Sequence, residues 1–506
     1  MSKSKNIFGG FFWSLLGNIL NAIYGFFSVP ILLVYFGKTD YGIIGLAMSI
    51  NIYLRLMDMG LASGNVKFFS SSIVKQDNNI ISKLFQSSLV LYGIIGIINV
   101  ITIFIISFFV KDLFQISAFQ AQTLKYLLYV VMFTSLVSWI SSAFEQYIRA
   151  NELVGWHQKI MIIPKLLQVL IIVITIQFNL SLILFFTLQT ICSIIVFPIF
   201  VYKVRTINPS LKIRFIYFHD VFKNVLLYSL SIFSFSIFQI SANYFRPIIL
   251  GIKLGVDSIA DYRIIEGFAN LVMMLGVSFV GVILPTATKV VSAGDYEKEL
   301  KIAFDGTKFI TIFLCLIVTG FILVSNELLD IYVGSKYSYL CIWLNLWVFS
   351  LLGSHNSALS SLVLASDNLK PIVYISGFST IFSLCLAWFF VPYIGLGAVI
   401  ISYLVYVILQ LSFYYVYYYR KVMGYDSKKL FLKSFFIPAL KIFSIFLLIY
   451  TLKSFFQVSN SYVTIVFWEI IYVVMVFPVI YYFVINVDER SFLLNLIINK
   501  KKNERD

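Results

Sequence analysis

Residues 85–110 read FQSSLVLYGIIGIINVITIFIISFFV, a run without a single Asp, Glu, Lys or Arg. A helix needs about 20 mostly apolar residues to cross the hydrocarbon core of a bilayer. Runs of that length recur from Phe8 to Val484, and hydrophobic residues make up 60% of the 506 residues, charged residues only 12%. Soluble domains are about half apolar and about a quarter charged. The pattern therefore predicts an all-α polytopic membrane protein, and not the alternating strands of a membrane barrel.

Hydropathy and turn residues predict about fourteen membrane spans. The connections between them are short, so none is expected to form a soluble domain. The apolar N-terminal run is too long for a signal-peptide core and lacks a small-residue cleavage site, and we interpret it as a retained first span. The expected spans are 8–36, 41–66, 85–110, 125–148, 156–178, 180–203, 222–254, 259–288, 303–324, 340–365, 371–391, 396–418, 432–452 and 462–485.

Basic residues are concentrated in the connections on one side of these spans. An even number of spans places both termini on that side, where Lys and Arg outnumber those of the opposite connections by roughly four to one. Cytoplasmic connections are the ones rich in Lys and Arg, so both termini are predicted to lie in the cytoplasm, with the chain in the bacterial inner membrane. The formal net charge of +15 then reflects topology and contact with anionic membrane lipids, and no nucleic-acid partner is expected.

Two stretches about 217 residues apart resemble each other. Residues 29–47 read VPILLVYFGKTDYGIIGLA, and residues 246–265 read RPIILGIKLGVDSIADYRII. Each has a span with Pro, a turn with Gly and Asp, and a second span, and an offset of six helices gives both the same orientation. Chance similarity between apolar sequences is the competing interpretation. A true repeat predicts two six-helix lobes, residues 1–204 and 205–420, as parallel pseudo-two-fold repeats around a central cavity, with two additional C-terminal helices and a basic tail in residues 421–506.

Ionisable residues inside the predicted spans are the candidate functional residues, because a charge at the centre of a membrane helix costs about 2.5–3.5 kcal/mol. Arg55 and Asp58 lie three residues apart, as do Arg263 and Glu266. This spacing allows each pair to meet on one helix face. Structural ion pairs and functional charges are both open interpretations for the two pairs.

Arg246 is the strongest candidate, because it lies near mid-depth of its span without an acidic neighbour in sequence. A guanidinium group donates two parallel hydrogen bonds to phosphate oxygens and keeps its charge. Lys165 follows Pro164 within another span, while Gln239 and Asn243 lie at i, i+4 ahead of Arg246 and are equally open to helix–helix contact. The candidate substrate-binding residues are Arg55, Lys165, Gln239, Asn243, Arg246 and Arg263, and the candidate coupling or ion-pair residues are Asp58, Asp261 and Glu266.

Sequence patterns of catalysis are missing from the chain. It has no Walker A segment, no HExxH and no GxSxG, which are the patterns of ATP hydrolysis, metalloprotease and α/β-hydrolase chemistry. The four cysteines all lie in apolar runs and have no metal-ligand spacing. We therefore expect a transporter rather than an enzyme, with no cofactor and no metal site.

Three segments resemble a known family. MDMGLASGNVKFFS (Met57 to Ser70) resembles the end of the second helix in polysaccharide flippases of the multidrug/oligosaccharidyl-lipid/polysaccharide exporter (MOP) superfamily. ADYRIIEGFANLV (Ala260 to Val272) and GDYEKELK resemble the corresponding parts of the second lobe, and the resemblance runs from about residue 6 to about residue 420. The two lobes predicted from the repeat indicate alternating access, and the family resemblance implies an undecaprenyl-diphosphate-linked glycan as substrate. It also implies pyrophosphate binding by arginines of the second and eighth helices, which are Arg55 and Arg263 here.

The leading hypothesis is thus a flippase that moves an undecaprenyl-diphosphate-linked oligosaccharide, such as an O-antigen or capsule repeat unit, to the outer leaflet. One alternative is a flippase for the peptidoglycan lipid precursor. Another is a cation-coupled multidrug exporter of the same fold, but the first span has no carboxylate for such coupling. A membrane glycosyltransferase or acyltransferase is disfavoured by the missing catalytic residues. Further expected partners are membrane lipids and other polysaccharide-assembly membrane proteins.

Overall fold

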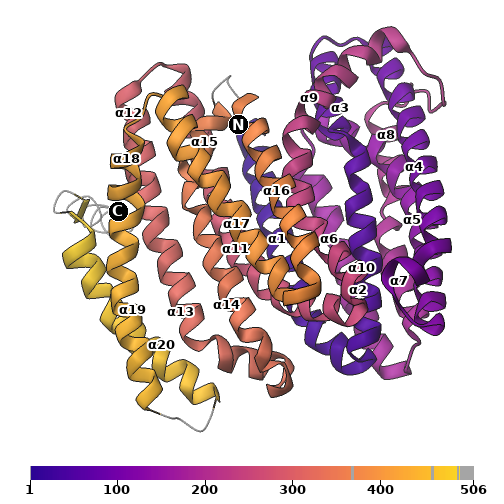
Figure 1. Cartoon of the computed structure of the whole chain (residues 1–506). Helices are drawn as coiled ribbons and strands as arrows, with labels where there is room; N and C mark the ends of the chain where they lie inside the picture. Colours follow the sequence, from indigo (N-terminus) through magenta and orange to yellow (C-terminus); the bar gives the residue numbers. More distant parts are fainter. Residues whose placement is uncertain (1, 366–369, 457–460, 487–488, 491–506) are drawn as a thin grey trace, which may run out of the picture. The chain divides into compact units, whose positions relative to one another are not determined.

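The computed structural model describes residues 2–365, 370–456, 461–486 and 489–490. All regular elements among these residues are helices, and they form two compact units (Figure 1). Unit 1 comprises Met1–Gly267 and Ser376–Ser402, and unit 2 comprises Phe268–Ile375 and Tyr403–Asp506. These units are groups of helices in mutual contact. The lobes expected from the repeat, with limits at residues 204 and 420, concern symmetry rather than contact and stay a prediction.

Unit 1 holds the N-terminal helices. They are α1 (Ser2–Phe36), α2 (Lys38–Leu54), the 3-10 segment η1 (Arg55–Asp58), α3 (Leu61–Val74), α4 (Asn78–Phe114), α5 (Ala118–Ala150), α6 (Val154–Phe178), α7 (Leu182–Ile194), α8 (Phe197–Ile207), α9 (His219–Tyr244) and α10 (Arg246–Leu254). Three further helices have residues in both units: α11 (Val256–Ser292), α16 (Lys370–Ile394) and α17 (Leu396–Phe413).

Unit 2 holds shorter helices interrupted by 3-10 and π segments. They are α12 (Tyr296–Lys301), η2 (Ile302–Gly306), α13 (Thr307–Val333), η3 (Ser335–Leu340), α14 (Cys341–Ser350), η4 (Leu351–Asn356), α15 (Ser357–Ala365), η5 (Tyr414–Val422), α18 (Ser427–Leu430), η6 (Phe431–Phe436), α19 (Ile437–Phe455), α20 (Ser461–Val479) and η7 (Ile480–Val484). Figure 1 shows α19 and α20 beside α13, which both helices contact.

The length and composition of these helices are those of membrane spans. Ten helical segments of the described chain are long and apolar enough to cross a membrane. An eleventh is the bent pair Lys38–Asp58 and Leu61–Val74, whose halves meet at 42°. The bend follows from Met59 and Gly60, which have positive φ angles of 48° and 74° and so end one helix and begin another.

The longest hairpin of unit 1 is formed by α4 and α5, which lie side by side (Figure 1). Ser117 and Gln120 begin α5 with a capping box, in which each side chain accepts a hydrogen bond from the other's backbone N–H. The inner faces of these helices bury a cluster of aromatic rings, among them Phe85, Tyr92 and Tyr147. The same cluster includes residues of α3 and α9, so it holds these helices against α4 and α5.

Candidate functional site

The two repeat segments pack against each other within unit 1. On α2, a Cβ atom at Gly42 would lie 2.1 Å from the Val256 carbonyl oxygen of α11, and one at Gly45 would lie 3.1 Å from Ile259 Cγ2. Only glycine lets the two backbones come this close. The contact partners advance together along both chains, so α2 and α11 run in the same direction along this seam.

Polar contacts close the N-terminal end of the α2–α11 seam. Lys38 Nζ lies 2.8 Å from Asp261 Oδ1, and its ammonium group also donates to Oδ2 at 2.9 Å. Thr39 Oγ1 donates to Asp257 Oδ1 at 2.8 Å. The candidate residue Asp261 is therefore one partner of an ion pair between the two repeats. Its partner Lys38 lies 223 residues away in sequence and was not among the candidates.

The Arg263–Glu266 pair forms, and it also ties α11 to α2. Arg263 Nη1 donates to Glu266 Oε2, while Nη2 donates to Ser49 Oγ at 2.6 Å and to the Gly45 carbonyl oxygen at 3.2 Å. Side-chain exposure is 16% for Arg263 and 12% for Glu266. The positive charge of Arg263 is thus neutralised on its own helix, and its Nη2 donates hydrogen bonds to the neighbouring helix.

Arg55 and Asp58 have separate partners, although both lie in η1. Arg55 is exposed, and its Nη2 donates to Ser138 Oγ of α5 at 3.3 Å. Asp58 accepts hydrogen bonds from the Tyr92 hydroxyl at 3.0 Å and from the backbone N–H of Ala62 at 3.2 Å. The two side chains form no ion pair within 4.0 Å, and among the described residues the guanidinium of Arg55 hydrogen-bonds only the neutral Ser138.

A buried polar network surrounds the carboxylate of Asp58. Its Tyr92 partner lies on α4 near Ser88, whose Oγ donates to Asn65 Oδ1 of α3 at 3.0 Å. The Asn65 amide in turn donates to Gln146 Oε1 of α5 at 3.0 Å. These residues were not predicted, because neutral polar side chains cost far less in a membrane than charges and leave a weaker signal. Among these residues only Ser88 and Tyr92 share a helical spacing, four residues apart on α4, so their partners on other helices have no local signal in the sequence.

Arg246, the strongest candidate from sequence, is packed inside unit 1. It begins α10 directly after the break at Phe245, with Pro247 in the first turn of the helix. The side chain is only 1% exposed, and its Nη2 donates to Ser383 Oγ of α16 at 3.2 Å. In this conformation a soluble or lipid-borne anion does not reach the guanidinium from outside.

The remaining candidates do not join Arg246. On α9 the Asn243 amide donates to the Gln239 carbonyl oxygen of its own helix at 2.9 Å, and the Gln239 side chain is exposed. Lys165 of α6 is half-buried, without a hydrogen-bond or ion-pair partner among the residues that the structure describes. Lys165 and Arg55 are therefore the candidate cations that no described carboxylate neutralises at contact distance.

Two ion pairs of unit 2 were not predicted from the sequence. Lys453 Nζ of α19 lies 2.8 Å from Glu327 Oε1 of α13, and Lys308 Nζ lies 2.6 Å from Glu489 Oε2. The partners are separated by 126 and 181 residues. Only the packing of α13 against the C-terminal helices brings them together. No group of three or more potential metal ligands occurs in the described part of the chain.

Comparisons with known proteins agree with this architecture. The model of the family described as "Polysaccharide biosynthesis protein" matches residues 7–291, more than half of the chain. No curated protein matches the sequence. Among solved structures, "Lipid II flippase MurJ, inward closed conformation" aligns with a TM-score of 0.73 and 16% identity, over 94% of this chain and 98% of that one.

Two multidrug transporters share the fold as well. An inward-facing MATE family transporter of the MOP superfamily aligns with a TM-score of 0.61 and 15% identity, over 78% of this chain and 92% of that one. The MATE multidrug transporter DinF-BH, solved as a complex, aligns with a TM-score of 0.55 and 19% identity, over 84% and 96%. The prediction of an all-α multi-pass membrane protein with this superfamily's fold is confirmed. The chain belongs to the polysaccharide biosynthesis protein family, and it is a multi-pass membrane protein with the fold of the MurJ flippase and of MATE transporters.

Proposed function

We propose that this protein is a flippase that translocates an undecaprenyl-diphosphate-linked oligosaccharide from the cytoplasmic to the outer leaflet by alternating access. The observation that carries the proposal is the state of Arg55. Its guanidinium is exposed at the bend of a membrane span and, among the described residues, bonds only the neutral Ser138, while the nearby Asp58 is held by Tyr92. A guanidinium fork in such a place suits the paired oxygens of a diphosphate. The half-buried Lys165 would add a second cation for the same ligand.

The proposal includes fourteen spans in the bacterial cytoplasmic membrane, with both termini in the cytoplasm. The ten spans and the bent pair account for eleven. Within the proposal, the long helices α1 and α11, and the consecutive pair α9 and α10, are counted as three more. The proposed number is then the fourteen predicted from hydropathy, which keeps the charge asymmetry of the connections. The two six-helix lobes around a central cavity, followed by two further helices, remain part of the proposal.

Alternating access requires the predicted outer side to open, and the seam between α2 and α11 is the place where we propose that it does. Its end is closed by the ion pair Lys38–Asp261 and by the hydrogen bond from Thr39 to Asp257. The Lys38 side chain is 31% exposed and the Thr39–Asp257 hydrogen bond is exposed, so water competes with both interactions and weakens them. Contacts weakened in this way can hold the outer side closed and still separate during each transport cycle.

A cation-coupled exporter of the same fold is the second candidate, and a specific observation favours it. Asp58 is a membrane-embedded carboxylate with hydrogen-bond donors already in place, which is the kind of group that proton coupling needs. Against it, the exposed charge at the bend is cationic, and a cation disfavours cationic drugs. A flippase for the peptidoglycan lipid precursor is the third candidate, and it differs only in the glycan that is carried.

The decisive experiment measures undecaprenyl-diphosphate glycans in cells depleted of the protein. Lipid extracts are analysed by mass spectrometry, together with labelling of the glycan at the outer surface, after complementation with wild type, Arg55→Ala or the control Lys336→Ala. Lys336 is an exposed lysine of unit 2 on the predicted outer side. We expect undecaprenyl-diphosphate glycans to accumulate in the inner leaflet of depleted cells. Wild type and Lys336→Ala should remove this accumulation, and Arg55→Ala should not. Unchanged glycan lipids together with greater sensitivity to cationic drugs would favour the exporter instead.

A further inference from the structure

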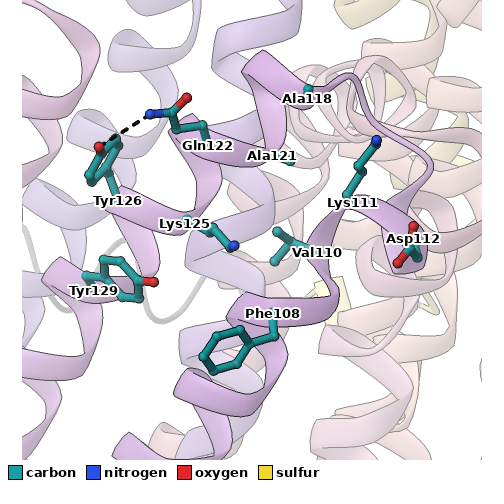
Figure 2. A pocket seen from close by; sticks show the side chains of 10 residues that line it. All are labelled: Phe108, Val110, Lys111, Asp112, Ala118, Ala121, Gln122, Lys125, Tyr126 and Tyr129. Atoms are coloured by element: carbon teal, nitrogen blue, oxygen red, sulfur yellow. Dashed lines mark hydrogen bonds between the residues drawn. The ribbon is translucent and has the colours of Figure 1, made fainter.

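A pocket of about 520 Å³ lies where α4 ends and α5 begins (Figure 2). It is separate from the α2–α11 seam and from all the candidate residues discussed above. Two lysines line it: Lys111 lies in the last turn of α4, and Lys125 lies in the second turn of α5. One carboxylate, Asp112, lines it as well. The lining therefore carries a net charge of +1, two lysines against one aspartate.

The two ammonium groups are not neutralised in the structure. Neither Lys111 nor Lys125 has an ion pair or a hydrogen bond to any residue that the structure describes, Asp112 included. Lys125 Nζ instead lies 5.7 Å from the ring centre of Phe108, across the hairpin (Figure 2). A cation over a ring face keeps its charge and its N–H donors available for an anion. The pocket thus offers positive charge at a fixed place.

The surroundings of the pocket are lipid-facing. The most apolar window of α4 has only 28% of its residues buried inside the protein, so most of this window is left uncovered by the described helices, as expected for a lipid-facing surface. Phe108 is 56% exposed, and Tyr126 and Tyr129 at the α5 edge of the pocket are 44% and 39% exposed. Tyrosines concentrate at the depth of lipid headgroups, where the ring is apolar and the hydroxyl is wet. Figure 2 shows both tyrosines at one side of the pocket, with Gln122 donating to the Tyr126 hydroxyl at 3.4 Å.

We propose that this pocket binds the phosphate of a membrane lipid in the predicted outer leaflet. Lysine ammonium groups and tyrosine hydroxyls supply hydrogen-bond donors for the phosphate oxygens, while the exposed rings beside them contact the first carbons of the acyl or prenyl chains. A water-soluble anion gains nothing from those rings. The phosphate is carried either by an anionic phospholipid or by a polyprenyl phosphate, and both present the same chemistry at this depth. The inference does not depend on which substrate the protein transports.

Lipid binding to the purified full-length protein tests the proposal. Native mass spectrometry in detergent would follow the titration of phosphatidylglycerol, phosphatidylcholine and undecaprenyl phosphate. Each lysine near a membrane surface contributes a factor of about five to the affinity for an anionic lipid, since one charge is worth about 1 kcal/mol there. We expect Lys111→Gln and Lys125→Gln each to weaken the binding of the anionic lipids about fivefold, and the double variant about 25-fold. Asp112→Asn is expected to strengthen binding.

Controls separate the possible outcomes. Lys336→Gln removes an exposed lysine elsewhere on the predicted outer side and should leave lipid binding unchanged, and size-exclusion profiles would report folding of every variant. Loss of phosphatidylglycerol binding in the double variant identifies a phospholipid site, and selective loss of undecaprenyl phosphate identifies a site for the carrier lipid. Unchanged binding of both anionic lipids in the double variant overturns the proposal. Displacement of the lipid by an equal molar concentration of inorganic phosphate also overturns the proposal, because a lipid-phosphate site binds the lipid more tightly than free phosphate.

Discussion

Arg263 Nη2 donates a hydrogen bond of 2.6 Å to Ser49 Oγ, which joins α11 to α2 across 214 residues of sequence. Both residues follow the turn with Gly and Asp that marks each repeat. The same guanidinium bonds Glu266 on its own helix, so its charge is neutralised locally while its geometry is used between the repeats. The seam between α2 and α11 is therefore polar at its centre and at its end.

Gly42→Ala is expected to destabilise the protein. A Cβ at this position would lie 2.1 Å from the Val256 carbonyl oxygen, and because that atom belongs to the backbone, the two helices must move apart. Overpacking of this kind costs about 1–3 kcal/mol. Gly25→Ala is the matched control, since nothing lies within 4 Å of its would-be Cβ. Thermal unfolding in detergent, followed by size-exclusion chromatography, should show a lower midpoint for Gly42→Ala alone; equal midpoints would contradict the close packing.

A covalent link between Thr39→Cys and Asp257→Cys is expected to stop transport. Their side chains are 2.8 Å apart, so a short thiol cross-linker reaches both. If the seam has to open during each cycle, cross-linking abolishes surface exposure of the glycan, and cleavage of a reducible linker restores it. The four native cysteines would be replaced in the background protein. Full activity after complete cross-linking would show that α2 and α11 stay together throughout transport.

Arg246→Ala is expected to lower stability more than Arg55→Ala. Arg246 is 1% exposed and is among the largest fully buried side chains, so its truncation leaves a cavity beside Ser383. Truncation of large buried apolar side chains costs about 2–5 kcal/mol, and we expect a loss of this order from the volume removed at Arg246. Arg55 is exposed, and its loss should leave the unfolding midpoint nearly unchanged. Arg246→Met, which retains most of the volume, should recover part of the loss. Equal midpoints for Arg246→Ala and Arg55→Ala in the same detergent would refute this assignment.

Glu327→Gln is expected to destabilise unit 2, whereas Glu327→Leu combined with Lys453→Leu is tolerated. Each partner of this pair is 17% exposed. Removal of one partner leaves the other charge uncompensated in a low-dielectric environment, which costs about 3–5 kcal/mol, while removal of both charges is often nearly neutral. Unfolding midpoints of Glu327→Gln, of the single variants Glu327→Leu and Lys453→Leu, and of the double leucine variant measure the difference. A double variant less stable than both singles would show that the pair itself stabilises the protein.

The amino-acid sequence by itself determined the class of the protein. Long apolar runs leave no alternative to membrane helices, because every backbone polar group has to be satisfied within its own segment in lipid. The spacing of Arg263 and Glu266 predicted an ion pair, and this pair forms, because residues three positions apart on an α-helix lie next to each other. The same spacing at Arg55 and Asp58 does not produce an ion pair. The segment η1 is a 3-10 turn at a bend, and Tyr92 and Ser138 offer competing partners.

Only the tertiary structure decided which distant side chains meet. Lys38 and Asp261, Lys453 and Glu327, and the network from Asp58 to Gln146 each join helices that are far apart in sequence. No local pattern encodes such pairs, because a charged or polar residue in a span looks the same whether its partner is a neighbouring helix, a lipid or a ligand. The burial of Arg246 is decided in the same way, by the packing of α16 over the start of α10. The sequence thus determines that the helices form and that they carry costly polar groups, whereas helix packing determines which of those groups are satisfied within the protein and which remain open to a ligand.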